Sequence, residues 1–246
     1  MTALDFRALR ATAVTGGADD ETMEFLENLW TIAPEKSVEG ILAAAFNFDM
    51  EGFVLLARLL KKVVPGRSSS GAPEIVTVDE WPILFTSGDL HIGGNLPLEN
   101  TQVIVLGNLT VDGVIGSYRD FETTRLVVLG DLTALGLEGD KEIFVDGALT
   151  ADIIWFEGKT GELMAETIEA RVLYSGTNER LHAQTLRVDY GFTAKKPVKP
   201  DAMQSVLAPE AFEPEDGYVF EGHPGYGCVN RALRLMARGR PGLLQH

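Results

Sequence analysis

Cysteine and basic side chains are scarce in this chain of 246 residues. Cys228 is the only cysteine, so no intrachain disulfide framework exists, and a cytoplasmic location is expected. Lysine and arginine number 21 against 36 acidic residues, which gives a net charge of −15. A field of this sign repels phosphates, so we expect no binding to nucleic acid.

Long apolar runs are also missing. No stretch reaches the roughly 18 apolar residues that would suggest a membrane-spanning helix. Residues 1–10 lack the basic-then-apolar pattern of a signal peptide. We therefore expect no membrane association. Hydrophobic residues make up 45% and charged residues 23%, a composition typical of a globular protein with a sizeable core.

No catalytic or metal-binding signature is present. The sequence has no glycine-rich phosphate loop, no Ser–His–Asp order and no cysteine cluster. The histidines are His91, His182, His223 and His246. His91 and His182 fall in the first and last copies of the repeat described next, about 24 Å apart at the spacing of stacked strands, which is too far to share a metal. The sequence therefore predicts no enzyme, no metal and no cofactor.

A repeated motif is the strongest feature that the sequence does contain. A short apolar segment is followed by Gly-x-Leu-x-(Val, Ile or Ala), and then by a second apolar pair. Four copies begin at Gly88, Gly107, Gly130 and Gly147, and two degenerate copies begin at Glu166 and Gln184. Successive copies are 19, 23, 17, 19 and 18 residues apart.

This period, with two or three short strands in each copy, predicts a parallel β-solenoid. We interpret segments such as 126–128 and 143–145 as strands in which apolar and polar positions alternate. The glycine is expected at a corner that needs a positive φ or a tight turn. One internal column is expected to contain Leu90, Leu109, Leu132, Leu149, Ile168 and Leu186. A meandering antiparallel sandwich is the alternative fold.

The repeat divides the chain into three parts. Residues 1–72 predict helices and a linker, residues 73–194 a solenoid of about six coils, and residues 195–246 a proline-rich tail ending in a short basic helix. The predicted fold class is therefore mainly β with helical flanks. Because open solenoid ends invite growth, we expect the flanks to cover the first and last coils and to leave a monomer or small oligomer.

The segment 103–113, Val-Ile-Val-Leu-Gly-Asn-Leu-Thr-Val-Asp-Gly, resembles the right-handed β-helix of bactofilins, which are bacterial polymer-forming proteins. The resemblance covers 83–192 and implies a parallel β-helix that stacks end to end. This chain differs from bactofilins in its large flanks. Solenoids with helical extensions also resemble, more loosely, some bacterial immunity and partner-binding proteins. That resemblance implies a protein that neutralises a basic partner such as a nuclease.

Acidic residues are concentrated in the solenoid. Residues 73–158 hold 15 acidic and 3 basic side chains, a net of −12. We interpret this block as a face for a basic protein partner, since its charges would steer association. The candidate partner-binding residues are Tyr118, Asp120, Phe121 and Glu122 of an inserted loop, and Asp89 and Asp131 at repeat corners.

Asp89 and Asp131 also permit a second interpretation. Two coils apart, they lie about 9–10 Å from each other, near the carboxylate separation of inverting glycosidases. However, the position after a corner glycine favours Asp and Asn through turn chemistry alone. The leading hypothesis is a non-catalytic acidic binding protein. The alternatives are a polymerising structural solenoid and a carbohydrate-active β-helix enzyme.

Overall fold

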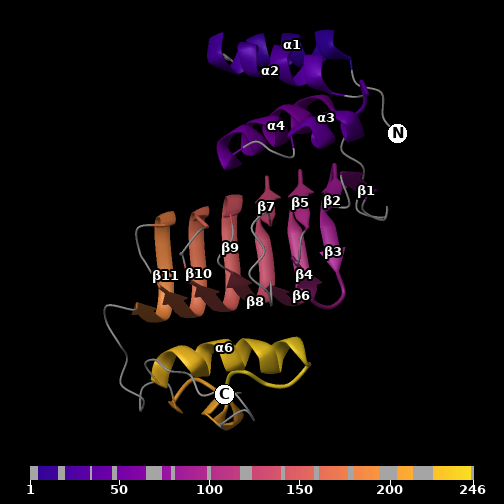
Figure 1. Cartoon of the computed structure of the whole chain (residues 1–246). Helices are drawn as coiled ribbons and strands as arrows, with labels where there is room; N and C mark the ends of the chain where they lie inside the picture. Colours follow the sequence, from indigo (N-terminus) through magenta and orange to yellow (C-terminus); the bar gives the residue numbers. More distant parts are fainter. Residues whose placement is uncertain are drawn as a thin grey trace.

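The computed structural model describes residues 5–15, 20–33, 35–45, 49–64, 74–78, 81–98, 101–116, 124–139, 142–157, 161–176, 180–193, 204–212 and 224–244. A parallel β-solenoid of about five turns forms the centre, and helices lie on two of its sides (Figure 1). The predicted fold class is confirmed. No helix among those described has the length and hydropathy of a membrane-spanning segment.

The solenoid is built from short strands that stack on their counterparts in the next coil. The strands are β1 (Glu74–Val78), β2 (Trp81–Thr86), β3 (Leu90–Ile92), β4 (Leu96–Pro97), β5 (Gln102–Val105), β6 (Leu109–Gly116), β7 (Arg125–Val128), β8 (Leu132–Gly139), β9 (Glu142–Phe156), β10 (Leu163–Ser175) and β11 (Leu181–Thr193). These strands pair in parallel, except that β1 is antiparallel to β2 at one edge. Parallel pairing rules out the antiparallel sandwich.

The predicted internal column is confirmed in its register. Successive pairings align Leu90, Leu109, Leu132, Leu149, Ile168 and Leu186. The first five side chains are at most 7% exposed, whereas Leu186 is 52% exposed. The difference arises because β11 pairs only with β10 in the described part of the chain, so no further coil covers Leu186.

Four helices pack against one lateral side of the solenoid (Figure 1). They are α1 (Phe6–Thr15), α2 (Asp20–Ile32), α3 (Val38–Ala45) and α4 (Met50–Val63). Their apolar side chains form one buried cluster with outward-facing residues of β2, β5 and β7, among them Phe85, Ile104 and Val127. The prediction that this flank covers the first coil is therefore wrong, because the helices cover the sides of several coils.

The strands under these helices are apolar at nearly every position. Residues 103–106 and 126–129 are buried throughout, on both faces of the sheet. Strands covered on both faces have continuous apolar runs, whereas strands exposed on one face alternate. Our interpretation of 126–128 as an alternating strand was therefore wrong. The continuous apolar run of these residues indicates that a second layer covers their outer face.

The C-terminal helix α6 (Pro224–Ala237) packs against another lateral side (Figure 1). With the short helix η2 (Pro209–Phe212) it buries outward-facing residues of β6, β9 and β10, including Val114, Ile153 and Val172. Gly136 allows the close approach, since a Cβ there would lie 2.4 Å from Cδ2 of Leu233. The described part of this tail does not cover the last coil as expected, because η2 and α6 lie along the side; residues 194–203 and 213–223 lie outside the described residues.

Candidate functional site

Asp89 and Asp131 belong to a ladder of hydrogen bonds along one corner of the solenoid. Oδ1 of Asp89 accepts a hydrogen bond from the backbone N–H of Asn108 at 2.7 Å. In the next coils, Oδ1 of Asn108 accepts from the N–H of Asp131, and Oδ1 of Asp131 accepts from the N–H of Ala148, both at 2.9 Å. Each side chain therefore holds the following coil in place, which gives both aspartates a structural role.

The ladder explains why glycine recurs in the motif. A Cβ on Gly107 would lie 2.4 Å from Oδ1 of Asp89, and a Cβ on Gly147 would lie 2.3 Å from Oδ1 of Asp131. The glycine thus leaves room for the side chain of the preceding coil and, at Gly107, also for its backbone, since the Cβ would lie 2.6 Å from the carbonyl carbon of Gly88. Positive φ is not the reason, because Gly94 and Gly239 are the positive-φ glycines among the residues described.

The two degenerate copies follow the same rule. Ala148 occupies the ladder position of its coil and offers no side-chain acceptor, and the next copy begins with Glu166 instead of glycine. Thr167 occupies the following ladder position, and the last copy begins with Gln184. Loss of the Asx side chain in one coil is therefore matched by loss of the glycine in the next.

One side of the solenoid is covered by neither group of helices, and we call it the open face. It consists of the outward side chains within 89–93, 108–112, 131–135, 148–152, 167–171 and 185–189. A row of exposed threonines, Thr110, Thr133 and Thr150, runs along its middle. Because strand side chains alternate, the residues two positions before and after each threonine point to the same side.

Carboxylates border both edges of the open face in its first four coils. Asp89 and Asp131 lie along one edge, and Asp112 and Asp152 lie along the other. His91 is the only basic side chain on this part of the face, and its Nε2 lies 2.8 Å from Oδ1 of Asp112. In the last two coils the charges are mixed, and Arg187 pairs with Glu169 at 2.5 Å. The acidic excess therefore lies at one end of the face.

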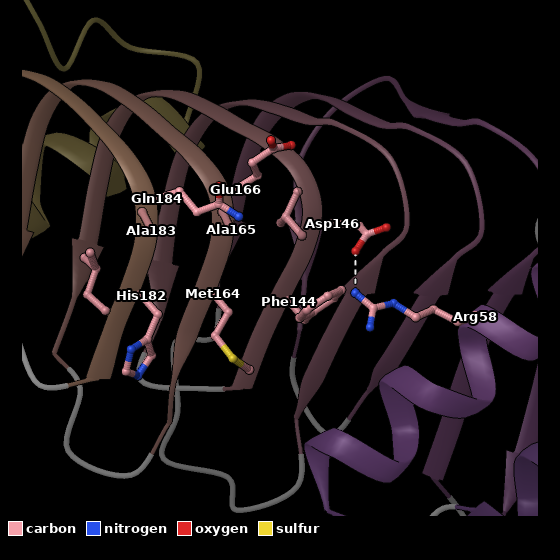
Figure 2. A pocket seen from close by; sticks show the side chains of 11 residues that line it. Arg58, Phe144, Asp146, Met164, Ala165, Glu166, His182, Ala183 and Gln184 are labelled. Carbon is pink, nitrogen blue, oxygen red and sulfur yellow. Dashed lines mark hydrogen bonds and ion pairs between the residues drawn. The ribbon is translucent and has the colours of Figure 1, made fainter. Parts of the chain in front are cut away.

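A groove with a volume of about 500 Å³ lies next to α4 (Figure 2). Its floor contains Phe144, Met164 and His182, which are in register across β9, β10 and β11. Figure 2 shows Met164 between the other two side chains. This row continues the row of outward side chains that α1–α4 bury on earlier coils, and it becomes more exposed from Phe144 to His182.

Arg58 of α4 forms one wall of the groove (Figure 2). Its Nη2 lies 2.6 Å from Oδ1 of Asp146, and its guanidinium carbon lies 5.3 Å from the centroid of the Phe144 ring. The side chains of Arg58 and Asp146 are 52% and 42% exposed, so this ion pair is worth at most about 1 kcal/mol. A stronger ligand for Asp146 would displace Arg58 at little cost.

The last strand leaves an unpaired edge. Among the strands described, β11 has β10 as its only neighbour. Leu186 and Tyr190 on β11 are 52% and 38% exposed, respectively. An edge of 13 residues with exposed apolar side chains is a template for pairing with another strand.

A buried polar pair joins α6 to the solenoid. Nδ2 of Asn230 donates a hydrogen bond to Oε1 of Glu138 at 2.9 Å, and both residues are 5% exposed. Burial raises the pKa of Glu138, although the Asn230 hydrogen bond and the charge of Arg234 act in the opposite direction. Burial also raises the pKa of Cys228, which makes its thiol a poor nucleophile.

The predicted loop residues Tyr118, Asp120, Phe121 and Glu122 lie outside the described residues, as do His223 and His246. His91 and His182 lie in the first and last coils. Within the described ranges, no group of three His, Cys, Asp or Glu side chains is placed to hold a metal ion.

Sequence reasoning missed the groove next to α4. Its signal is a change along one corner of the repeat, where Leu106 and Leu129 are buried under the helices and the exposed Asp146 and Glu166 follow them. A change from apolar to acidic residues at the same position of successive copies indicates the coil at which the covering layer ends.

Comparisons with known proteins identify no relative of this chain. No family model matches it, and no curated protein or solved structure matches it. Function is therefore inferred below from surface geometry and charge.

Proposed function

We propose that this protein is a non-catalytic binding protein whose open face takes a basic protein partner. The supporting observation is the placement of Asp89, Asp112, Asp131 and Asp152 along the two edges of one face, whose first four coils carry His91 as their only basic side chain. Asp152, at the end of this set, also shares a cavity with Arg171 and Arg240. Carboxylates on the same edge are two coils, or about 9–10 Å, apart, a distance at which exposed like charges still repel one another at low salt. Lysine and arginine side chains of a partner would relieve that repulsion.

The solenoid suits this role because it holds the carboxylates in fixed positions. Oδ1 of Asp89 and Oδ1 of Asp131 are bound to backbone N–H groups, so these side chains lose little conformational freedom on binding. Long-range attraction also speeds the encounter with a basic protein. A nuclease is a fitting partner class, since an acidic face can occupy a site built for phosphates. This is the immunity-protein version of the proposal.

The experiment is a pull-down with the full-length protein immobilised, at low and at moderate salt. The test variant is Asp112→Asn with Asp152→Asn, which removes two charges from the open face without touching the corner ladder. The matched control is Glu24→Gln with Glu51→Gln, which removes two exposed charges from α2 and α4. We expect a basic protein that wild type and control retain at low salt and that the test variant loses. Equal retention by all three would contradict the proposal.

A second candidate function is end-to-end stacking, the bactofilin-like alternative. It is supported by the unpaired edge of β11 with exposed Leu186 and Tyr190. Pairing of two copies through this edge would be isologous and would close at a dimer, so a filament needs a further contact at another surface. Electron microscopy and sedimentation of the full chain distinguish filaments from monomers.

A further inference from the structure

The groove next to α4 has an apolar centre that the covering layer leaves half-exposed. On earlier coils the same row of outward side chains, Phe85, Ile104 and Val127, is at most 3% exposed beneath the helices. On β9 and β10 the row continues with Phe144 and Met164, which are only partly buried. The apolar row that the helices bury on earlier coils therefore continues onto β9 and β10, where the helices cover it only in part.

Acidic side chains lie on both sides of this apolar row. Glu142 and Asp146 stand two positions before and after Phe144 on β9. Glu162 and Glu166 stand two positions before and after Met164, and both are exposed. Side chains two positions apart on a strand point to the same side, so the apolar row runs between two acidic rows.

The carboxylates of the two successive coils are not equally neutralised. Glu142 pairs with Arg125 at 2.5 Å, and Asp146 pairs with Arg58 at 2.6 Å. Neither Glu162 nor Glu166 has an ion-pair partner among the residues that the structure describes. The negative charge beside the apolar row therefore increases from β9 to β10, and on the next coil the two rows continue with Arg180 and Gln184.

The dimensions of the groove fit one α-helix. Residues four positions apart on a strand are about 13 Å apart, which sets the separation of the two acidic rows. A helix with its side chains is about 10–12 Å wide. From β9 to β11 the floor extends about 10 Å, which is the length of roughly two helical turns.

We propose that this groove binds a basic amphipathic helix of a partner protein, as an additional member of the layer formed by α1–α4. Apolar side chains of that helix cover Phe144 and Met164, and lysine or arginine side chains on both flanks reach the carboxylates of Glu162 and Glu166. Asp146 can exchange Arg58 for a cation of the partner. The inference rests on the proposed function, because it locates a second contact area for the basic partner.

The probe is a fluorescently labelled model peptide of about 18 leucine and lysine residues, long enough to be helical, with the leucines on one face. One control peptide has the same composition in shuffled order without an apolar face. Another replaces every lysine by glutamate. Anisotropy titrations with the full-length protein at physiological salt should show binding of the amphipathic basic peptide, and at least about tenfold weaker binding of both controls.

Two groove variants test the location independently. Glu162→Gln with Glu166→Gln removes charge, and Met164→Ser removes apolar surface. Each should weaken binding about tenfold, while Glu24→Gln with Glu51→Gln, at exposed residues that do not line the groove, should leave it unchanged. If Met164→Ser does not fold, the charge variant still decides the question.

Three results would overturn the groove proposal: equal binding of the shuffled peptide, wild-type binding by the charge variant, or equal loss of binding in the control Glu24→Gln with Glu51→Gln. A change in oligomeric state with Met164→Ser would instead assign the groove to a second copy of the chain. The proposed function fails separately, if the pull-down retains no basic protein that depends on the open face.

Discussion

Oδ1 of Asp89 lies 2.7 Å from the backbone nitrogen of Asn108 and only 2.4 Å from the position that a Cβ on Gly107 would take. The side chain that binds the next coil therefore also helps to exclude a side chain from the residue that begins it. The same relationship links Asp131 to Ala148 and Gly147. The Gly-Asx pair is therefore a contact between neighbouring coils, and it recurs at Gly88-Asp89, Gly107-Asn108 and Gly130-Asp131.

This relationship predicts coupled effects of substitution at Gly147 and Asp131. Gly147→Ala should destabilise the protein by about 1–3 kcal/mol, because the new Cβ overlaps the Asp131 side chain. Asp131→Ala should cost about 1 kcal/mol for the lost hydrogen bond. The destabilisation of the double variant should be smaller than the sum of the two single effects, because the double variant reproduces the Ala148–Glu166 arrangement of the next coil. Denaturant unfolding measures all three, and strictly additive effects would contradict this account of the glycine.

The internal column predicts a position-dependent cost for one and the same substitution. Leu132→Ala should reduce the free energy of unfolding by about 2–5 kcal/mol, because Leu132 is fully buried between two coils. Leu186→Ala, in the same column, should cost far less because Leu186 is 52% exposed. Equal destabilisation by both would show that another surface covers the last coil in solution.

Glu138 predicts a dependence of stability on pH. Burial raises its pKa in the folded state above that in the unfolded chain. At low pH both states are protonated, and as pH rises through the folded-state pKa the native protein must ionise a buried group, so Glu138 contributes progressively less stability. Glu138→Gln retains an acceptor for Asn230 and does not titrate.

Denaturant unfolding at several pH values tests this prediction. The stability of Glu138→Gln relative to wild type should increase from acidic to neutral pH. The amide of the variant also offers a donor to Oδ1 of Asn230, which has no hydrogen-bond partner in the native pair. A difference between the two proteins that does not change with pH would show that Glu138 does not titrate differently in the folded state.

The exposed edge of β11 predicts self-association that depends on concentration. Leu186→Lys should shift the protein towards the monomer, because charged side chains on an edge oppose strand pairing. Ile32→Lys is the matched control, since Ile32 is an exposed apolar residue on α2, 58% exposed. Sedimentation velocity measures both. A wild-type protein that stays monomeric over the whole concentration range would remove end-to-end stacking from consideration.

The core of the solenoid was predictable from sequence because each coil repeats one local rule. Gly, Asx and Leu recur at fixed offsets, and stacking turns those offsets into the column from Leu90 to Ile168. The placement of the helices was missed, although the continuous apolar run at 103–106 indicates a covered outer face. A sequence pattern indicates that a face is covered. Which element covers it depends on the packing of the whole chain, which the local pattern does not contain.

The groove was harder to predict, because it depends on where α4 ends relative to β9. Arg58 and Asp146 are 88 positions apart in sequence, and their contact follows from the packing of four helices on the solenoid. Neither residue belongs to a motif. The open-face carboxylates Asp89 and Asp131, by contrast, were predictable from their repeat positions.

The central claim is that the open face attracts a basic partner, and the salt dependence of the association rate tests it most directly. With the partner from the pull-down, the rate constant would be measured by stopped flow for wild type, for Asp112→Asn with Asp152→Asn, and for the control Glu24→Gln with Glu51→Gln. We predict that the rate falls steeply with salt for wild type and control, and that it is lower and less salt-dependent for the open-face variant, because screening acts on exposed charges. The same rate and salt dependence in all three proteins would contradict the account.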